Sequence, residues 1–327
     1  MVELLPVSEL ISNHPAHIRE SFHPDYEKGA GFVIDKVKPL QETNIPITDL
    51  GFMRADAVYD VVTVSRGKFF KLENHQKRFA RSCSRMRLTN PYNSDQEAKI
   101  LNDLVAKTGF KDAFVWWCVT RGSNPNFPSD RLNPNKFNNR FFAFAVPYIF
   151  IKEDKDKVKG INLYISQDYI RIPPGSIDPR AKNFCQLDLA MSLFEAGDHG
   201  ANWSVLSDGE GALVEAPGCN IFVVKDNQIS TPNIGCLEGI TRETTIELAT
   251  EMNLIVKTRR VTIEELQSAD EVFLTSSAGG ILPVSFLSGE QFGEGVGPIT
   301  KQIHNLYWKK RWDGWEAQDV DYLGGEN

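Results

Sequence analysis

The segment from Ala57 to Phe70 most constrains what this chain folds into. It reads AVYDVVTVSRGKFF, a run of β-branched and aromatic residues broken only by the pair Arg66-Gly67. Such runs favour strands, and a two-residue break that contains glycine favours a tight turn. The segment therefore predicts a β-hairpin, and with it an antiparallel sheet in the first half of the chain.

Helical periodicity follows the hairpin. An apolar residue recurs every seven positions over 72–87, which predicts a helix with one buried face. Ser94 and Glu97 have the spacing of a capping box, so a second helix is predicted from Ser94 onward. The recurring residues of the first helix are Leu72, Phe79 and Met86.

Further strands are predicted on both sides of a long loop. The runs 113–120 and 140–151 are β-branched and aromatic, and the Asn- and Pro-rich stretch 122–139 separates them. A loop of that length is usually functional. The polar residues 1–29 are expected to form an irregular arm.

A length of 327 residues predicts two domains of roughly 150 residues each. The charged run KEDKDKVKG at 152–160 is the predicted linker between an N-terminal domain, 1–151, and a C-terminal domain, 161–327. Because strands often follow strands directly, the predicted fold class is α+β, with mainly antiparallel or mixed sheets. The second half is expected to contain strands near 161–166, 205–230, 255–261, 271–277 and 281–287, and helices near 183–196, 241–252 and 298–312.

Charge and cysteine usage exclude several classes of protein. The formal net charge is -7, so no nucleic-acid partner is expected, and the basic residues near Arg78 have the spacing of a solvated helix face. The cysteines form no C-x-x-C pair and are predicted to be reduced, buried thiols. They are Cys83, Cys118, Cys185, Cys219 and Cys236.

No membrane or metal partner is predicted. Residues 1–11 contain acidic side chains and no long apolar run, which argues against a secretory signal, and no stretch reaches the ~18 apolar residues of a membrane span. A cytoplasmic protein is therefore expected. His14 and His17 could be proposed as metal ligands, but Pro15 lies between them and a third ligand is missing, which favours a surface loop.

Lys182 lies just before an apolar helical stripe, within the segment IDPRAKNFCQLDLAMSLFEAG. A lysine at such a position is either a surface residue whose stem covers apolar atoms or a partly desolvated amine. Composition alone favours the surface alternative, because lysine is rarely buried unpaired.

Three other segments carry groups that suit an anionic, ring-containing ligand. A helix predicted from Thr241 follows Leu237-Glu238-Gly239-Ile240, and its N-terminus would offer free N–H groups, although an ordinary Thr N-cap explains it too. Glu215, ahead of Pro217-Gly218, would suit a pyridine nitrogen or simply face solvent. Ser276 and Ser277 end a strand before two glycines, as in a ligand-binding turn or an ordinary one.

Together, in order and spacing, these segments closely resemble the fold type IV aminotransferases, which include branched-chain and D-amino-acid aminotransferases. The resemblance covers residues 31–308 and is nearest to the (R)-selective amine transaminases. It implies an α+β fold of two α/β domains with pyridoxal 5′-phosphate between them, and a homodimer. The motifs that carry the resemblance are DLGFMRADAVYDVVTV, FKLENHQKRF, VTRG, AVPYI, DPRAKN, EAPGCNIFVVKD, LEGITR, SSAGG and VGPIT.

Carried onto this chain, the resemblance implies that Lys182, within the predicted C-terminal domain, is the Schiff-base lysine and that Glu215 pairs with the pyridine nitrogen. The phosphate would be bound by residues of three segments. The implied reaction moves an amino group from an (R)-configured amine to a 2-oxo acid such as pyruvate, through an internal aldimine at Lys182. The implied phosphate-binding residues are Arg78, Ile240, Thr241, Ser276 and Ser277.

The residues around the expected substrate depart from the family pattern. Where many (R)-amine transaminases have a segment N-x-x-W-G-D-L, this chain has Gln186 and Leu187 in place of Trp and Gly. Arg54 and Arg131 are candidates for binding a substrate carboxylate, with a solvated loop arginine as the alternative for Arg131. Tyr59, Phe114, Trp116 and Trp117 are candidates for an aromatic pocket wall or for core positions.

Three functions therefore compete. The first is an (R)-selective amine:2-oxo-acid aminotransferase. The second keeps the cofactor with another substrate, as a branched-chain or D-amino-acid aminotransferase, or as a lyase acting on aminodeoxychorismate. The third keeps the fold as a cofactor-binding or interaction module without catalysis, for which the Gln186-Leu187 segment is the only support.

Overall fold

The computed structural model describes residues 3–7, 22–124 and 132–323. The chain divides into two compact units. Unit 1 comprises Met1–Ser8, Phe150–Arg180 and Gln186–Asp313, and unit 2 comprises Glu9–Ile149, Ala181–Cys185 and Gly314–Asn327.

Unit 2 is built on a seven-stranded sheet with the order β16-β4-β3-β5-β6-β1-β2, in which every described pair is antiparallel. The expected hairpin is confirmed, since β3 and β4 pair across Arg66-Gly67. The strands are β1 (Ala30–Val33), β2 (Lys36–Pro39), β3 (Ala57–Ser65), β4 (Lys68–Phe70), β5 (Ala113–Ser123), β6 (Asn138–Pro147) and β16 (Ala317–Asp319).

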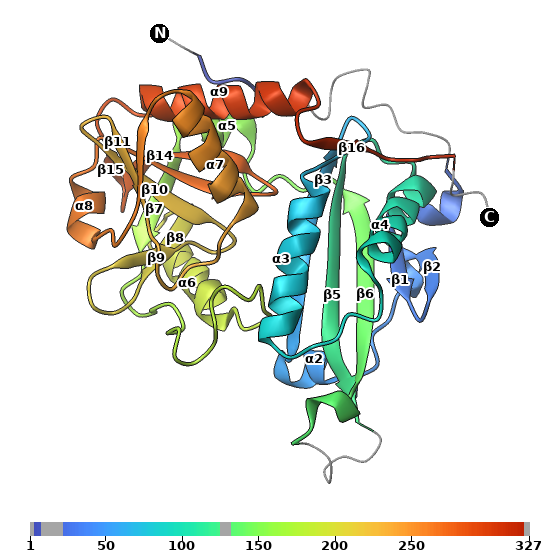
Figure 1. Cartoon of the computed structure of the whole chain (residues 1–327). Coiled ribbons are helices and arrows are strands. Elements are labelled where there is room, and N and C mark those ends of the chain that lie inside the picture. Colours follow the sequence, from blue (N-terminus) through green and yellow to red (C-terminus); the bar gives the residue numbers. More distant parts are fainter. Residues whose placement is uncertain (1–2, 8–21, 125–131, 324–327) are drawn as a thin grey trace. The chain divides into compact units, whose positions relative to one another are not determined.

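Two helices cover one face of this sheet, α3 (Leu72–Arg85) on β3 and α4 (Ser94–Thr108) on β6 (Figure 1). Alternate residues of the strands enter the core beneath them, among them the fully buried Trp117. A short helix, α2 (Leu50–Arg54), precedes β3, and 3-10 turns lie at Pro24–Tyr26, Leu40–Glu42 and Pro134–Lys136. The strand residues that alternate with the core residues lie on the other face of the sheet, where α2 packs on β5.

Unit 1 contains a nine-stranded mixed sheet with the order β12-β11-β10-β13-β14-β7-β8-β9, to which β15 adds beside β14. The pairs β11·β12, β14·β7 and β7·β8 are parallel. The strands are β7 (Ile161–Ile165), β8 (Trp203–Ser207), β9 (Leu213–Glu215), β10 (Asn220–Lys225), β11 (Gln228–Thr231), β12 (Ile255–Thr258), β13 (Glu271–Ser276), β14 (Gly280–Leu287) and β15 (Glu290–Gln291).

The helices of unit 1 are α5 (Asp154–Lys159), α6 (Leu187–Asp198), α7 (Ile240–Glu251), α8 (Ile263–Gln267) and α9 (Pro298–Trp312). Glu271 fixes the start of α9, because its carboxylate accepts hydrogen bonds from the Ile299 and Thr300 amides at 3.0 and 2.8 Å. Gly297 permits this contact, since a Cβ there would lie 2.0 Å from Glu271 Cδ. The VGPIT motif is thus a helix N-terminus closed by a buried carboxylate.

The fold class predicted from the sequence is confirmed, but several boundaries were wrong. The predicted linker 152–160 instead contains α5, which packs on β14 within unit 1. Residues 314–323 return to unit 2, because β16 pairs with β4. The predicted loop 122–139 is shorter, since β5 continues to Ser123 and β6 begins at Asn138.

Two helix starts also differ from the prediction. The capping box of α4 is Asn93 with Gln96, one residue before the predicted Ser94 and Glu97. α6 begins at Leu187 rather than near Asn183, because the Asn183 side chain accepts a hydrogen bond of 2.9 Å from the Cys185 amide, a turn that competes with helix formation. The residues of the predicted arm and His14 and His17 lie largely or wholly outside the described residues.

Candidate active site

The backbone at Lys182 is fixed from two directions within unit 2. Its carbonyl accepts a hydrogen bond of 2.9 Å from the Tyr59 amide on β3, and the next residue, Asn183, forms a bridge with Val58. The Lys182 amide donates a bond of 3.1 Å to Ser82 Oγ on α3. Lys182 therefore belongs with unit 2 rather than with the C-terminal half of the chain.

The Lys182 amine lies against Tyr59. Nζ donates a hydrogen bond of 3.1 Å to the Tyr59 hydroxyl and lies 4.2 Å from the centre of its ring. Within the described parts of the chain, no carboxylate is in ion-pair contact with this amine. The side chain is half-buried rather than a solvated surface lysine. An amine without a competing carboxylate can react with a carbonyl group.

A row of aromatic rings continues from Tyr59 across the sheet face opposite α3 and α4. Trp116 stacks on Tyr59 with ring centres 5.7 Å apart and on Phe144 at 5.2 Å. Phe184, two residues after Lys182, meets the Tyr59 ring edge-on at 5.7 Å. Phe114 extends the row beside Phe144, at 6.4 Å. Trp117 points to the core on the opposite face, because side chains alternate along β5.

Arg78 is buried in an ion pair on the core side of α3. Its Nε and Nη2 donate to the two carboxylate oxygens of Asp60 at 2.8 and 2.6 Å, and His75 Nδ1 lies 2.8 Å from Asp60 Oδ1. Burial alone would raise the pKa of Asp60, but Arg78 and His75 hold it well below its ordinary value. The expected phosphate ligand thus has two of its donors directed at a carboxylate, which fixes the plane of the guanidinium.

Ser82 links Arg78 to Lys182 and was missed from the sequence. Its hydroxyl donates a hydrogen bond of 3.0 Å to the Arg78 carbonyl and accepts one from the Lys182 amide. The residue is fully buried. The sequence holds no local signal for this role, because Ser82 and Lys182 are 100 residues apart.

The predicted carboxylate-binding arginines are not equivalent. Arg54 is the last residue of α2 and is exposed, while Arg131 lies outside the described residues. Arg140, which the sequence did not single out, lies on the same sheet face as the aromatic row, since it pairs with Thr120, two residues along from the pair of Cys118 and Phe142. Its Nη1 is 3.6 Å from Asp49 Oδ2, too far for a hydrogen bond.

Glu215 ends β9 in unit 1 and is 6% exposed. Oε1 accepts a hydrogen bond of 2.7 Å from Arg171 Nε, and Oε2 accepts one of 3.0 Å from the Leu237 amide. It is therefore not a solvent-facing turn residue. Arg171 was missed from the sequence, where its only signal is a charge inside the apolar segment YIRIPP.

The N-terminus of α7 brings the predicted Ile240 and Thr241 into unit 1 as buried first-turn residues. The N-cap Gly239 closes the helix with no side-chain hydrogen bond. A Cβ at Gly239 would lie 2.1 Å from Asn220 Oδ1. Asn220 Nδ2 donates a hydrogen bond of 2.8 Å to the Leu237 carbonyl. The loop is therefore held close to β10, with the first-turn amides of α7 oriented to meet an anion.

The remaining predicted residues of unit 1 lie at element ends. Ser276 ends β13, and its hydroxyl accepts a hydrogen bond of 2.8 Å from the Gly279 amide. Ser277 is half-buried in the turn that follows. Gln186 is the N-cap of α6 and provides no capping hydrogen bond. Among the residues that the structure describes, no group of His, Cys, Asp or Glu side chains is arranged to hold a metal ion.

Comparisons with known proteins agree with this fold. The sequence profile of the family Amino-transferase class IV matches residues 57–287. The branched-chain-amino-acid aminotransferase-like protein 2 of Arabidopsis thaliana is 28% identical over 89% of this chain and 52% of its own length, so the chain spans about half of that relative. The D-alanine aminotransferase of Listeria innocua is 28% identical over 84% of this chain and 93% of its own.

Among solved structures, the branched-chain aminotransferase of the archaeon Thermoproteus uzoniensis superposes with a TM-score of 0.81, at 24% identity, over 90% of this chain and 100% of the other. At that identity the likeness supports the fold alone. The family match covers more than half of the chain, and the chain belongs to the class IV aminotransferases. Enzymes of this class are transaminases that use pyridoxal 5′-phosphate.

The side chains described above fit this cofactor. A half-buried amine with a hydroxyl beside it suits an aldehyde, a buried carboxylate suits a protonated ring nitrogen, and the first turn of α7 suits a phosphate. Gly239 lets the loop ahead of α7 lie against Asn220, a contact that a Cβ would block, and this contact fixes where the first turn of α7 begins. In the described parts of the chain, no helix is long and apolar enough to cross a membrane.

Proposed function

We propose that this chain is a pyridoxal-phosphate-dependent aminotransferase that transfers an amino group from an (R)-configured amine to a 2-oxo acid such as pyruvate. The observation that carries the proposal is the Lys182 amine, held over Tyr59 at the end of an aromatic row. Lys182 would be the residue that binds the cofactor covalently. When bound, the cofactor supplies an electron-withdrawing ring that stabilises negative charge on the donor carbon.

In this proposal Lys182 also moves the proton. Nζ would take a proton from the donor carbon and, in the second half of the reaction, would deliver one to the acceptor carbon. The nitrogen would stay on the cofactor between the two halves, so that overall the amine and the 2-oxo acid become a ketone and an amino acid. Tyr59 would orient Nζ, since its hydroxyl accepts a bond from that amine. The backbone bonds to Tyr59 and Ser82 support this role, because they limit where the lysine stem can swing.

The other predicted residues would bind the cofactor. Glu215 would meet the ring nitrogen as a carboxylate, and the Ile240 and Thr241 amides would meet the phosphate, together with Arg78 and the hydroxyls of Ser276 or Ser277. The position of each group at an element end or in a fixed ion pair supports these roles, because binding groups held by the fold lose little freedom on binding.

The aromatic row supports an apolar or aryl donor. Tyr59, Trp116 and Phe144 stack on the sheet face opposite α3 and α4. Flat rings of this kind favour contact with an apolar substituent over a charged one. A simple amine would pack on this row.

The acceptor needs a cation for its carboxylate. Arg140 would serve, because it lies on the same sheet face and its Nη1 has no hydrogen bond to the described residues. Asp49 would hold the arginine when the carboxylate is absent, at the ion-pair distance of 3.6 Å. Arg54 and Arg131 remain further candidates, and Gln186 a candidate on the α6 side.

A branched-chain or D-amino-acid aminotransferase is the second candidate. It is favoured by the relatives, which are named as branched-chain aminotransferase-like protein and D-alanine aminotransferase. Such donors carry a carboxylate of their own, so that Arg140 would be used in both half-reactions.

We also propose that the chain forms a homodimer. Four large apolar side chains are exposed within one short stretch of unit 2, and patches of this kind commonly mark subunit interfaces. Gly51 packs α2 onto Thr120, which turns the apolar side chains of α2 outward. The exposed side chains are Ile45, Ile47, Phe52 and Met53. The molecular mass in solution tests this proposal. The Phe52→Asp variant is expected to shift from the mass of a dimer toward that of a monomer. A wild-type protein with the mass of a monomer would contradict the proposal.

The deciding experiment follows the visible absorption of the protein loaded with pyridoxal 5′-phosphate. (R)-1-phenylethylamine, its (S) enantiomer, leucine and D-alanine are added separately, without an acceptor. Bleaching by the (R)-amine alone supports the first function, whereas bleaching mainly by leucine or D-alanine supports the second.

Lys182→Ala provides the control for the lysine itself. The variant is expected to lose the band of the lysine-bound cofactor and all turnover. Lys225→Ala, at an exposed lysine paired with Asp270, is the matched control and should behave as wild type. Full turnover by Lys182→Ala, or a wild-type protein that shows no such band, would overturn the proposed function.

A further inference from the structure

Arg171 is a buried guanidinium shared between two carboxylates of unit 1. Nε donates a hydrogen bond of 2.7 Å to Glu215 Oε1, and Nη1 donates one of 2.8 Å to Asp188 Oδ2. The Ile172 amide donates to the same Asp188 oxygen at 2.8 Å. Only 9% of the Arg171 side chain and 7% of the Glu215 side chain are exposed. A carboxylate, an arginine and a second carboxylate thus form one line of contacts, from β9 to α6.

This line of contacts favours an ionised Glu215. A buried carboxylate is unfavourable unless charged or backbone donors meet it, and Glu215 has both, one on each oxygen. Burial would lower the pKa of Arg171, but Glu215 and Asp188 raise it above its ordinary value, so the guanidinium stays charged. Cys236, whose thiol has its pKa raised to about 11 by burial and by Glu215, adds no charge nearby.

Asp188 is held in a way that stability alone does not explain. Its Oδ1 is buried and has no hydrogen bond to the described residues, while Oδ2 accepts two. An unsatisfied buried oxygen lowers the stability of a fold, so its presence calls for another role. The other oxygen, Oδ2, meets the Nη1 edge of the Arg171 guanidinium, so holding that edge is a role that the position of Asp188 supports.

We propose that Arg171 is a positioning residue that keeps Glu215 ionised and correctly oriented, and that Asp188 in turn positions Arg171. The inference rests on the proposed function, in which Glu215 meets the ring nitrogen of the cofactor. A carboxylate that must hold a proton on that nitrogen has to stay charged while buried, and Arg171 supplies the opposite charge without taking the oxygen that Leu237 contacts.

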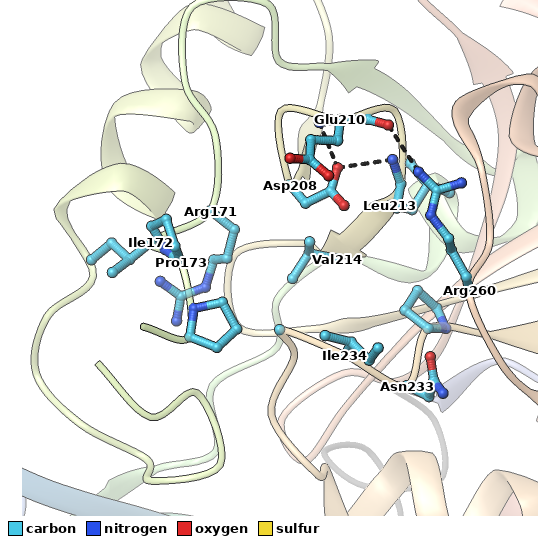
Figure 2. A pocket seen from close by; sticks show the side chains of 14 residues that line it. Arg171, Ile172, Pro173, Asp208, Glu210, Leu213, Val214, Asn233, Ile234 and Arg260 are labelled. Atoms are coloured by element: carbon cyan, nitrogen blue, oxygen red, sulfur yellow. Dashed lines mark hydrogen bonds between the residues drawn. The ribbon is translucent and has the colours of Figure 1, made fainter. Parts of the chain in front are cut away.

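A cavity beside Arg171 gives the test a second arm. Figure 2 shows the Arg171 side chain at its wall, with Pro173 and Val214 nearby and Arg260 on the far side. The cavity has a volume of about 210 Å³ and is partly open. A small cation can therefore reach the space that a shortened side chain would leave.

The test compares Arg171→Ala, Arg171→Lys and Asp188→Asn in the cofactor-loaded protein. Arg180→Ala is the matched control, because Arg180 lies in the same connection and pairs only with the partly exposed Asp178 among the described residues. Three properties are measured: the pH midpoint of the visible cofactor band, the rate of cofactor release on dilution, and turnover with and without added guanidinium at millimolar concentration.

For Arg171→Ala we expect the midpoint to move by about one pH unit, because the charge next to the ring nitrogen changes. Turnover should fall about 10- to 100-fold, as when residues that orient a ligand group are removed, and guanidinium should restore part of it. Arg171→Lys keeps the positive charge but cannot contact Glu215 and Asp188 at the same time as the guanidinium does. Its midpoint and turnover should therefore lie between those of Arg171→Ala and wild type. Asp188→Asn should show a smaller shift in the same direction.

An unchanged midpoint and release rate in Arg171→Ala, equal to those of Arg180→Ala, would overturn the inference while leaving the proposed function intact. A wild-type protein without the cofactor band would overturn the proposed function instead. If Arg171→Ala does not fold, the same comparison is made with Arg171→Lys and Asp188→Asn, and wild-type behaviour of both would count against the inference.

Discussion

The Lys182 amide donates its hydrogen bond to the hydroxyl of Ser82, a residue of α3 that is 100 positions earlier in the chain. The same hydroxyl donates to the Arg78 carbonyl. One buried serine therefore ties the helix that carries Arg78 to the connection that carries Lys182.

Ser82→Ala is predicted to lower the free energy of unfolding by about 1–3 kcal/mol, because it leaves the Lys182 N–H without its acceptor. Cofactor loading should slow as the connection loosens. Urea unfolding of the protein measures the first effect, and the growth of the visible band the second. Ser268→Ala, at the exposed serine that follows the last residue of α8, is the control. Equal stability of the two variants would contradict the prediction.

Tyr59→Phe removes the hydroxyl that meets Lys182 Nζ and keeps the ring that stacks on Trp116. We expect the rate of the amine half-reaction to fall about tenfold or more, equal to about 1.4 kcal/mol, because Nζ loses its orienting partner. Trp116→Phe should instead raise the concentration of amine needed for half-maximal rate. Stopped-flow absorption measures both, and a Tyr59→Phe rate equal to wild type would exclude an orienting role.

Arg140→Met is predicted to raise the KM for the 2-oxo acid about tenfold or more, since a charged hydrogen bond to the carboxylate is lost. The half-reaction with a simple amine should stay within about twofold, because that donor carries no carboxylate. Arg54→Met, at the exposed end of α2, is the comparison. If only Arg54→Met raises the KM, Arg54 is the acceptor-binding cation instead.

Glu97 predicts a pH-dependent stability. Burial raises its pKa from 4.5 to about 7, despite a hydrogen bond of 2.7 Å from Asn90. The folded protein keeps a proton that the unfolded chain releases in this range, so stability falls as pH rises from 4.5 to about 7, by about 3 kcal/mol at most. Glu97→Gln removes this component. Urea unfolding at about pH 5 and about pH 8 checks it, and an equal pH difference in both proteins would contradict it.

Gly297→Ala is predicted to destabilise unit 1 by about 1–3 kcal/mol, because the added Cβ would lie 2.0 Å from Glu271 Cδ and displace the carboxylate that closes α9. Gly197→Ala is the matched control. Gly197 is a helical glycine with no atom within 4 Å of the added Cβ, so that change should be neutral or stabilising. Thermal unfolding separates the two, and similar midpoints for both variants would reject the steric explanation.

Local patterns along the chain determined the class of fold and singled out Lys182 as the candidate for the reactive lysine. The hairpin around Arg66-Gly67 and the helix over 298–312 follow from strand and helix periodicity, which depends only on neighbouring residues. The motif around Lys182 belongs to the same kind of short-range information. So does the alternation along β5, which separates Trp116 from the core residue Trp117.

Only the tertiary structure decided which groups meet these residues. Arg171 reaches Glu215 across 44 positions, Arg78 reaches Asp60 across 18, and Lys182 reaches Tyr59 across 123. Buried charges and amides must find partners wherever the fold brings a donor or acceptor within about 3 Å, and sequence spacing carries no information about that distance. For the same reason the segment 181–185, which follows the predicted linker, joins unit 2 by pairing with β3.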